Sequence, residues 1–177
     1  NRCDDYPYGG GAGMVLMADP FFKAIDEHKN DDTKVVVPSP CGRQLDQELV
    51  KSLSKQKDLC ILCGHYEGID QRVIDTCADY EISIGDYVLS GGEFAALTMV
   101  DAVARYIPGF MSNQESINEE SFEMDLLEYP HYTRPANYND VSVPDVLLSG
   151  NHERIEKWRL QQQVERTKKI RPDLYKK

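Results

Sequence analysis

The stretch from Ile84 to Glu93 constrains the fold more than any other part of the chain. It has the pattern of a strand end, a bare glycine pair and a helix start. Because glycine has no side chain, a backbone of this kind can bring its own N–H and C=O groups close to a flat ligand. Two further glycine-bearing loops lie upstream, at residues 66–70 and 8–13. Together the three loops predict a ligand held mainly by loop backbone.

Apolar runs of strand length alternate with helical patterns up to Pro108. This alternation predicts an α/β fold with a mostly parallel sheet, whose ligand-binding loops follow the strands. The strand at 35–37 should be closed by Pro38-Ser39-Pro40. The predicted strands are 35–37, 59–63 and 80–84, and the predicted helices are 21–28 (capped by Asp19, with Pro20 next), one that begins at Asp46, 69–77 and 92–107. The last helix should place Ala96, Val100, Val103, Ala104 and Ile107 on one face.

A smaller second domain is predicted beyond the sheet. Residues 111–118 are polar, show no helical or strand periodicity and indicate a linker. The sequence pattern changes again after Pro130. A long helix should begin after Asn151, run from His152 to about Lys169 and bury one apolar side. That side would consist of Ile155, Trp158 and Val164.

The charge is distributed unevenly along the chain. Residues 1–150 hold 11 Lys and Arg against 26 Asp and Glu, whereas residues 151–177 hold 9 against 4. A basic tail on an acidic body is compatible with a polyanionic partner, because binding depends on local charge beyond a screening length of about 8 to 10 Å. A solvated helix face explains the tail equally well.

Cysteine usage and hydropathy indicate the cellular setting. The five cysteines are odd in number and lack framework spacing, which favours a reducing cytoplasm. No run approaches the roughly 18 to 20 apolar residues of a membrane span. Since the sequence begins at Asn1 rather than Met, we interpret it as a fragment, which leaves a removed signal peptide open.

Several familiar site patterns are incomplete here. Cys60 and Cys63 have zinc or redox spacing, but positions three apart in a strand point to opposite faces, so core packing is the better interpretation and no metal site is predicted. Residues 9–13 lack both the GK[ST] ending of a phosphate loop and the dinucleotide-binding spacing. No serine or cysteine lies in a GxSxG elbow, which leaves covalent acyl chemistry without support.

Six segments, in order along nearly the whole chain, closely resemble the bacterial tRNA (guanine-N1)-methyltransferase family. They are Tyr8 to Gly11, Pro40 to Arg43, Cys63 to Asp70, Ser83 to Glu93, Pro130 to Pro135 and Leu147 to His152. The resemblance implies a SPOUT-type parallel sheet with a deep C-terminal trefoil knot, S-adenosylmethionine as methyl donor, guanosine 37 of tRNA as acceptor, and an obligate homodimer with active sites across its interface. Family members are cytoplasmic.

The resemblance also implies a division of the chain. Residues 1–110 would form the knotted donor-binding domain without the family's opening strand and helix, residues 111–119 a flexible linker, and residues 120–177 a truncated, mostly helical tRNA-binding domain. Basic residues of the long helix would contact phosphates, and the target base would leave its stack to enter the site. These basic residues are Arg154, Lys157, Arg159, Lys168 and Lys169.

Three loops would hold the donor. Adenine is flat and has donors and acceptors on its edge, so backbone groups can read it between apolar walls from Ile84 and Leu89, while Glu67 attracts the cationic sulfonium. The implied donor-binding residues are Pro40, Gly42, Tyr66, Glu67, Gly68, Ser83, Ile84, Gly85, Tyr87, Leu89, Gly91 and Gly92.

Two residues would carry the chemistry. Guanine N1 must lose a proton before it attacks, and the position matching the family's catalytic aspartate is Glu120, with Glu119 as the neighbouring alternative. Arg105 maps to the arginine that stabilises negative charge on O6.

His65 stands where many relatives carry arginine. No dedicated magnesium ligand cluster is visible. Two other functions stay open: a non-catalytic tRNA-binding module, and a SPOUT relative that acts on another RNA.

Overall fold

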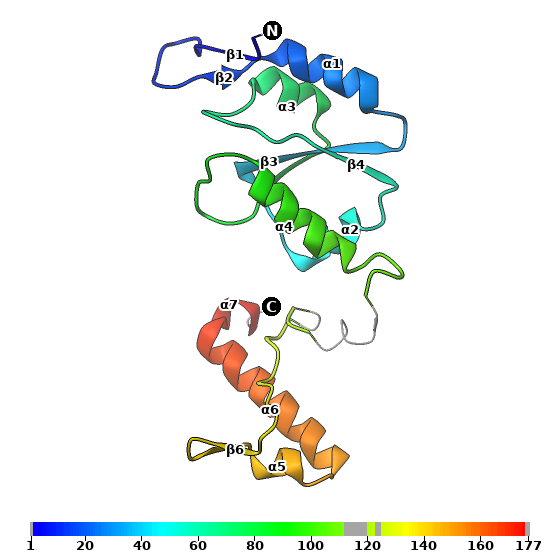
Figure 1. The fold of residues 1–177 in the computed structure, drawn as a ribbon, viewed down its shortest axis with the longest axis vertical. Coiled ribbons are helices and arrows are strands. Elements are labelled where there is room, and N and C mark those ends of the chain that lie inside the picture. The colour runs from blue at the N-terminus through cyan, green and yellow to red at the C-terminus, as the bar shows by residue number, and fades with distance from the viewer. Residues whose placement is uncertain (1, 112–119, 123–124, 176–177) are drawn as a thin grey trace. The chain divides into compact units, whose positions relative to one another are not determined.

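The chain forms two compact units, comprising Asn1–Met111 and Ser112–Lys177. The computed structural model describes residues 2–111, 120–122 and 125–175 (Figure 1). The predicted linker at 111–119 lies, apart from Met111, outside these described residues. Each unit is therefore considered by itself.

Unit 1 is built on a parallel sheet in the strand order β4-β3-β5. Figure 1 shows α1 and α3 on one side of this sheet and α2 and α4 on the other. A two-stranded antiparallel ribbon, β1-β2, precedes the sheet. The elements are β1 (Asp4–Asp5), β2 (Val15–Leu16), α1 (Ala18–His28), β3 (Thr33–Gln44), α2 (Gln47–Leu53), β4 (Asp58–Ile61), α3 (Gln71–Cys77), β5 (Tyr80–Ser83) and α4 (Glu93–Ala104). The predicted α/β class and parallel sheet are confirmed.

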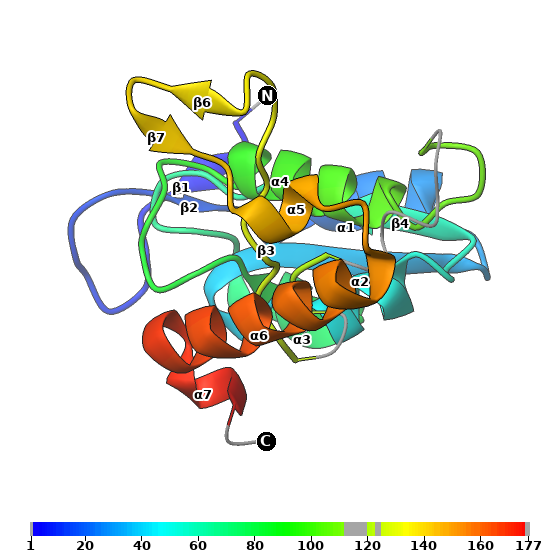
Figure 2. The same cartoon turned by 90° about the horizontal axis from the view of Figure 1, so that it is seen from below.

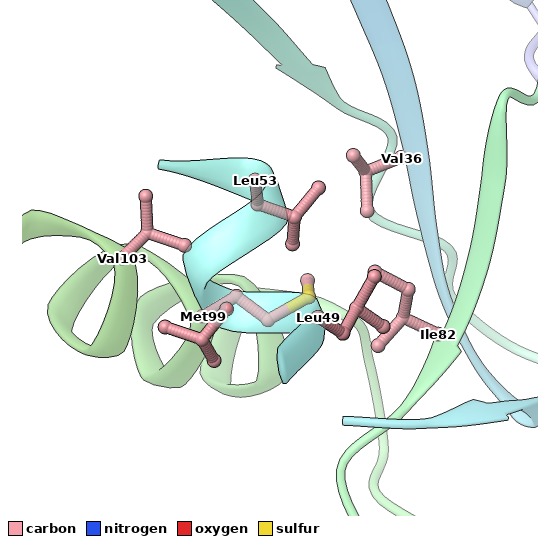
Figure 3. Packing of buried hydrophobic residues seen from close by; sticks show 7 residues of the cluster. Val36, Leu49, Leu53, Ile82, Met99 and Val103 are labelled. Atoms are coloured by element: carbon pink, nitrogen blue, oxygen red, sulfur yellow. The ribbon is translucent and has the colours of Figure 1, made fainter. Parts of the chain in front are cut away.

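The β-branched run at the start of β3 explains the layers. Successive strand residues point to opposite faces, so Val35 and Val37 contribute to one core and Val36 to the other. The first core joins them to α1 and α3. The second joins Val36 to α2, α4 and β5 (Figure 3). A strand buried on both faces needs apolar side chains at consecutive positions, which is why this run does not alternate with polar residues.

The prediction that Pro38-Ser39-Pro40 closes this strand is wrong, because β3 continues to Gln44. The prolines instead interrupt the pairing of β3 with β5. Pairing with β5 is interrupted after Pro38 and resumes at Arg43, and both of these residues lie opposite Ile82. Proline has no N–H to donate, so regular pairing fails there, and residues 39–42 bulge out before the strand resumes.

The helix predicted to begin at Asp46 is confirmed: Asp46 caps α2, and its carboxylate accepts from the N–H of Leu49. The helix predicted over 69–77 begins later, at Gln71, where Asp70 caps α3 by accepting from the N–H of Arg72. Asp19, however, does not cap α1, which begins at Ala18 after Met17. The first N–H groups of a helix have no intrahelical acceptor, so Pro20 is tolerated inside this turn and does not mark its edge.

The predicted apolar face of α4 is only partly buried. Ala95, Met99 and Val103 face the core, whereas Val100 and Ile107 are 51% and 46% exposed. Apolar residues surround this helix, so its periodicity does not single out the face that packs. The exposed apolar residues on or just beyond α4 are Phe94, Leu97, Val100 and Ile107.

The described residues of unit 2 form a hairpin and three helices. The antiparallel β6-β7 pair, visible in Figure 2, precedes α5 and α6. Asn151 caps α6 as predicted. Ile155, Trp158 and Val164 are only half-buried, and the fully buried positions are Gln163 and Thr167. The elements are β6 (Asn137–Tyr138), β7 (Val141–Ser142), α5 (Asp145–Leu148), α6 (His152–Ile170) and α7 (Pro172–Tyr175). Among the described residues, no helix has the length and apolar character needed to cross a bilayer.

Asp79 fastens the start of β5 to β3. Its carboxylate accepts from the N–H of Val35 at 2.9 Å and from the ammonium of Lys34 at 2.9 Å. Burial alone would raise the pKa of Asp79, but the Val35 N–H and Lys34 outweigh it and hold this pKa below its usual range. A carboxyl of this kind stabilises the fold above its unfolded pKa of about 3.9 and loses that contribution as pH falls through its folded pKa.

We expect Asp79→Ala to lower the free energy of unfolding by about 1 to 3 kcal/mol at pH 7, because a buried N–H and an ammonium lose a charged partner. Urea unfolding between pH 7 and pH 2 measures this difference, which should vanish in strong acid. Asp19→Ala removes the exposed pair with Lys23 and should cost less than about 0.5 kcal/mol. A deficit that is independent of pH would contradict the carboxylate's role.

Candidate functional site

A cavity of about 530 Å³ lies at the carboxyl edge of the three-stranded parallel sheet. It is lined by residues 37–41, 64–69, 81–85 and 87–92, together with Gln71, Ile74 and Ala95. Residues 37–41 lie in the bulged part of β3, residues 64–69 follow β4, and residues 81–92 run from the end of β5 into the loop after it. Ligands bind at this carboxyl edge of the sheet in open α/β folds. The cavity volume is within the range of small-molecule sites, about 300 to 1,000 Å³.

The structure brings nearly all the predicted donor residues together at this cavity. Those that line it are Pro40, Tyr66, Glu67, Gly68, Ser83, Ile84, Gly85, Tyr87, Leu89, Gly91 and Gly92. Gly42 is the exception. The convergence is a property of the fold, whereas the binding of a donor by these residues stays a prediction.

Gly42 packs against the backbone of β5. A Cβ atom at this position would lie 2.4 Å from the carbonyl carbon of Glu81 and 2.5 Å from the nitrogen of Ile82. No side chain fits between two backbones at that distance. Gly42 therefore holds residues 39–42, the first loop of the cavity, against the sheet.

The second loop, residues 64–69, is fixed by β2 and the residues before it. The N–H of Glu67 donates to the carbonyl of Met14 at 3.0 Å, and the N–H of Leu16 donates to that of Gly68 at 2.9 Å. Tyr66 has a φ of 58°, an uncommon left-handed conformation for a residue with a side chain. Such backbone strain persists only where the surroundings enforce it, and it is frequent at functional sites.

The glycine-rich segment 9–13 forms the connection between β1 and β2. The sequence predicts a mobile loop near a ligand. In the structure it approaches the second loop, because a Cβ atom at Gly13 would lie 2.5 Å from Oε1 of Glu67. Its residues do not line the cavity itself.

The third loop, residues 83–92, begins with a tight turn. Ser83 Oγ donates to the carbonyl of Gly85 at 3.1 Å and accepts from the N–H of Gly85 at 3.2 Å. The carbonyl of Ser83 also accepts from the N–H of Leu45 at 2.8 Å, which ties this turn to the end of β3. The third loop is thus held against the residue that follows β3.

The lining of the cavity is partly apolar and partly acidic. Apolar residues from all three loops, among them Pro40, Ile69 and Ile84, contribute to it. Glu67 and Glu81 are also lining residues. A flat ligand would therefore meet apolar surface beside two acidic residues.

Of the two predicted catalytic residues, only Arg105 belongs to unit 1, and it does not line this cavity. Arg105 is half-buried at the C-terminal cap of α4. A helix rises about 1.5 Å per residue, so Arg105 is roughly 18 Å along α4 from the end that lines the cavity. Glu120 is half-buried in unit 2. Glu119 lies outside the described residues. The roles of Arg105 and Glu120 stay predictions.

Sequence reasoning missed the residues that fix the segment after Glu120. Thr167 is fully buried, and its Oγ1 accepts from the N–H of Leu127 at 2.8 Å and donates to the carbonyl of Gln163 at 2.7 Å. Ser121 Oγ accepts from the N–H of Glu128 at 3.0 Å. A threonine in the middle of a charged helix carries no signal in the sequence that would distinguish it from a surface position.

The cysteines give no sign of a reactive or metal-binding site. Cys60 and Cys63 are free thiols, and burial raises the pKa of each. A raised pKa disfavours the thiolate, which is the nucleophilic and metal-binding form. Within the described part of the chain, no three His, Cys, Asp or Glu side chains are grouped as a metal site requires.

We expect Gly42→Ala to lower the free energy of unfolding of unit 1 by about 1 to 3 kcal/mol, because the added methyl meets backbone that cannot yield. Amide hydrogen exchange at residues 39–45 should accelerate as the first loop separates from β5. The neighbouring Cys41→Ala, at an exposed position, is the matched control and should change neither quantity. Normal stability and exchange in Gly42→Ala would show that the loop does not depend on this contact.

Comparison with known proteins places the chain in a family. The profile described as "tRNA (Guanine-1)-methyltransferase TrmD" matches residues 1–177. A tRNA (guanine-N(1)-)-methyltransferase of Ruminiclostridium cellulolyticum is 55% identical over 179 residues, covering 99% of this chain and 77% of the relative. Those of Syntrophomonas wolfei and Clostridioides difficile are 56% and 49% identical, covering 98% and 99% of this chain and 70% and 78% of the relatives. The chain therefore belongs to the tRNA (guanine-1)-methyltransferase TrmD family of enzymes.

Proposed function

We propose that this protein transfers a methyl group from S-adenosylmethionine to N1 of guanosine 37 in tRNA. Family membership and the names of its relatives support methyl transfer to a guanine of tRNA. The observation that carries the proposal is the convergence of three loops on one cavity at the carboxyl edge of the sheet. S-adenosylmethionine supplies a methyl group bonded to a positively charged sulfur.

The residues of unit 1 would hold the donor by shape and charge. Backbone edges of the first and third loops would read the adenine ring, with Ile84 and Leu89 as apolar walls. Glu67 would lie near the sulfonium and favour the charged donor over its neutral product. Gly42 would act indirectly, by holding the first loop in place.

Glu120 would prepare the acceptor. Its carboxylate takes the N1 proton of guanine, so that N1 can attack with an available electron pair. Negative charge then spreads to O6, where the guanidinium of Arg105 offers hydrogen bonds and an opposite charge. The N1–C bond forms as the carbon–sulfur bond breaks, and the sulfur keeps that electron pair.

A homodimer would complete the site. Arg105 stands at the far end of α4 from the cavity of its own chain, so a second copy is the natural source of the missing arginine. The exposed residues Phe94, Leu97 and Val100 give α4 an apolar surface that a second copy can cover. Each cavity would then face the Arg105 end of the partner's helix.

Unit 2 would bind the tRNA. Arg154, Lys157 and Lys169 are exposed on α6 and suited to phosphate contacts. Arg159 and Lys168 are already engaged with aromatic rings, over Tyr129 at 4.7 Å and Tyr175 at 4.5 Å respectively. We therefore assign Arg159 and Lys168 to the packing of unit 2, and we treat phosphate contacts by them as a secondary role.

The finer features of the fold belong to the same proposal. They are the division into residues 1–110, 111–119 and 120–177 and the trefoil knot, which the resemblance to the family implies. We also propose a cytoplasmic location, because a tRNA-modifying enzyme works there. A magnesium ion is compatible with this proposal, and no residue is assigned to hold one.

Purified protein mixed with labelled S-adenosylmethionine and a tRNA that carries guanine at positions 36 and 37 should label N1 of guanosine 37. Nuclease digestion followed by mass spectrometry identifies the nucleoside and its position. The same tRNA with adenine at position 37 is the control and should stay unlabelled. Label in an unrelated ribosomal RNA helix instead would favour a SPOUT relative with another substrate.

Glu120→Gln tests the base within that assay. Because the amide cannot accept the N1 proton, transfer should fall by about 100- to 10,000-fold, while tRNA binding is retained. Glu120→Asp restores the carboxylate and should stay active. If the wild-type protein binds both substrates yet transfers no methyl group, the chain is a tRNA-binding module and the catalytic proposal fails.

Thr167→Val tests the anchor behind Glu120. Valine has the same shape but cannot accept from Leu127 N–H, so unit 2 should lose about 1 to 3 kcal/mol of stability. Displacement of the segment that carries Glu120 should lower kcat by about tenfold or more, since misplacement by about 1 Å can cost about 100-fold. Donor affinity should not change. Thr167→Ser keeps the hydroxyl and is the control; equal kcat in the two variants would contradict the anchor.

A further inference from the structure

The second and third loops of the cavity are joined where α4 begins. His65 Nε2 and Glu93 Oε1 are 2.7 Å apart. Beneath this pair the backbones also meet, since His65 forms an antiparallel bridge with Gly91 and the N–H of Gly92 donates to the carbonyl of Gly64 at 2.8 Å. Two loops that are separate in sequence are thus connected by one side-chain pair and two backbone contacts.

Glycine at position 91 leaves room for this pair. A Cβ atom at Gly91 would lie 2.4 Å from Oε2 of Glu93 and 2.8 Å from Cε1 of His65. Both of those atoms are ends of side chains that can rotate away. A methyl group at position 91 would therefore separate the pair before it moved the backbone.

Glu93 carries its charge at neutral pH. Its own N–H and the His65 ring hold the pKa of Glu93 below its usual range. The side chains of His65 and Glu93 are 49% and 52% exposed. A pair so exposed adds little to the free energy of unfolding. Its main effect is therefore on the distance between the two loops that it joins.

We propose that His65 and Glu93 form a clasp that holds the second and third loops together and thereby sets the affinity for the methyl donor. The clasp rests on the proposed function, because it presumes that the donor lies between these loops. His65 and Glu93 are positioning residues here. They act through Tyr66 to Gly68 on one side and the Gly91-Gly92 pair on the other.

Titration calorimetry with the product S-adenosylhomocysteine tests the clasp without methyl transfer. His65→Ala and Glu93→Ala should each weaken binding by about three- to fivefold, the scale of an exposed ion pair. The double variant should bind no more weakly than either single variant, because only one interaction is lost. His65→Arg should restore wild-type affinity, since a guanidinium also pairs with a carboxylate. The KM for the donor should rise while kcat at saturating donor changes little.

Gly91→Ala gives an independent way to open the clasp. It should weaken product binding by a similar factor in the wild-type chain and have no further effect in the His65→Ala, Glu93→Ala background. A loss in both backgrounds would mean that Gly91 contacts the donor directly, and it would overturn the clasp as the reason for the effect.

Controls separate the possible failures. Lys23→Ala removes an ion pair on α1 that does not line the cavity, and it should leave binding unchanged. Absence of product binding by the wild-type protein would refute the proposed donor site itself. Normal wild-type binding with unchanged affinity in the clasp variants, or additive losses in the double variant, would refute the clasp alone. If the alanine variants unfold early in thermal melts, His65→Gln and Glu93→Gln are measured in the same cycle and judged by the same outcomes.

Discussion

Burial of β3 on both faces is the constraint from which the rest of unit 1 follows. Val35 and Val37 require one apolar layer, and Val36 requires another, so helices must cover the sheet from both sides. Parallel neighbours joined through such helices end at the same edge. The loops that leave this edge are therefore neighbours in space although they lie far apart in sequence. The cavity arises from that arrangement before any individual side chain refines it.

The sequence predicts the strands and helices well where local physics decides and poorly where packing decides. The cap at Asp46 is a matter of one carboxylate and one N–H, and it forms as predicted. The course of β3 beyond Pro40 depends on what β5 offers it, which no local pattern contains. The buried side of α4 depends on which of several apolar stripes meets the sheet. Thr167 likewise acquires its role only through a segment some forty residues away, which brings the N–H of Leu127 to it.

The candidate site, too, is only partly predictable from the sequence. Glycine loops after strands indicate where a ligand binds, and the ordered family motifs name the residues. Contacts such as Gly42 against β5, or His65 against Glu93, are apparent only in three dimensions. The cavity is built in unit 1, whereas the predicted base, Glu120, belongs to unit 2.

The missing side chain at Gly42 has a consequence for how a ligand enters and leaves. Because the first loop rests on the backbone of β5 without any intervening atoms, it can retreat only if the sheet itself deforms. It is a fixed wall. The other walls are loops held by hydrogen bonds and by half-exposed side chains such as His65 and Glu93. Any ligand that this cavity accepts should therefore displace side chains of the second and third loops more readily than the backbone of the first loop.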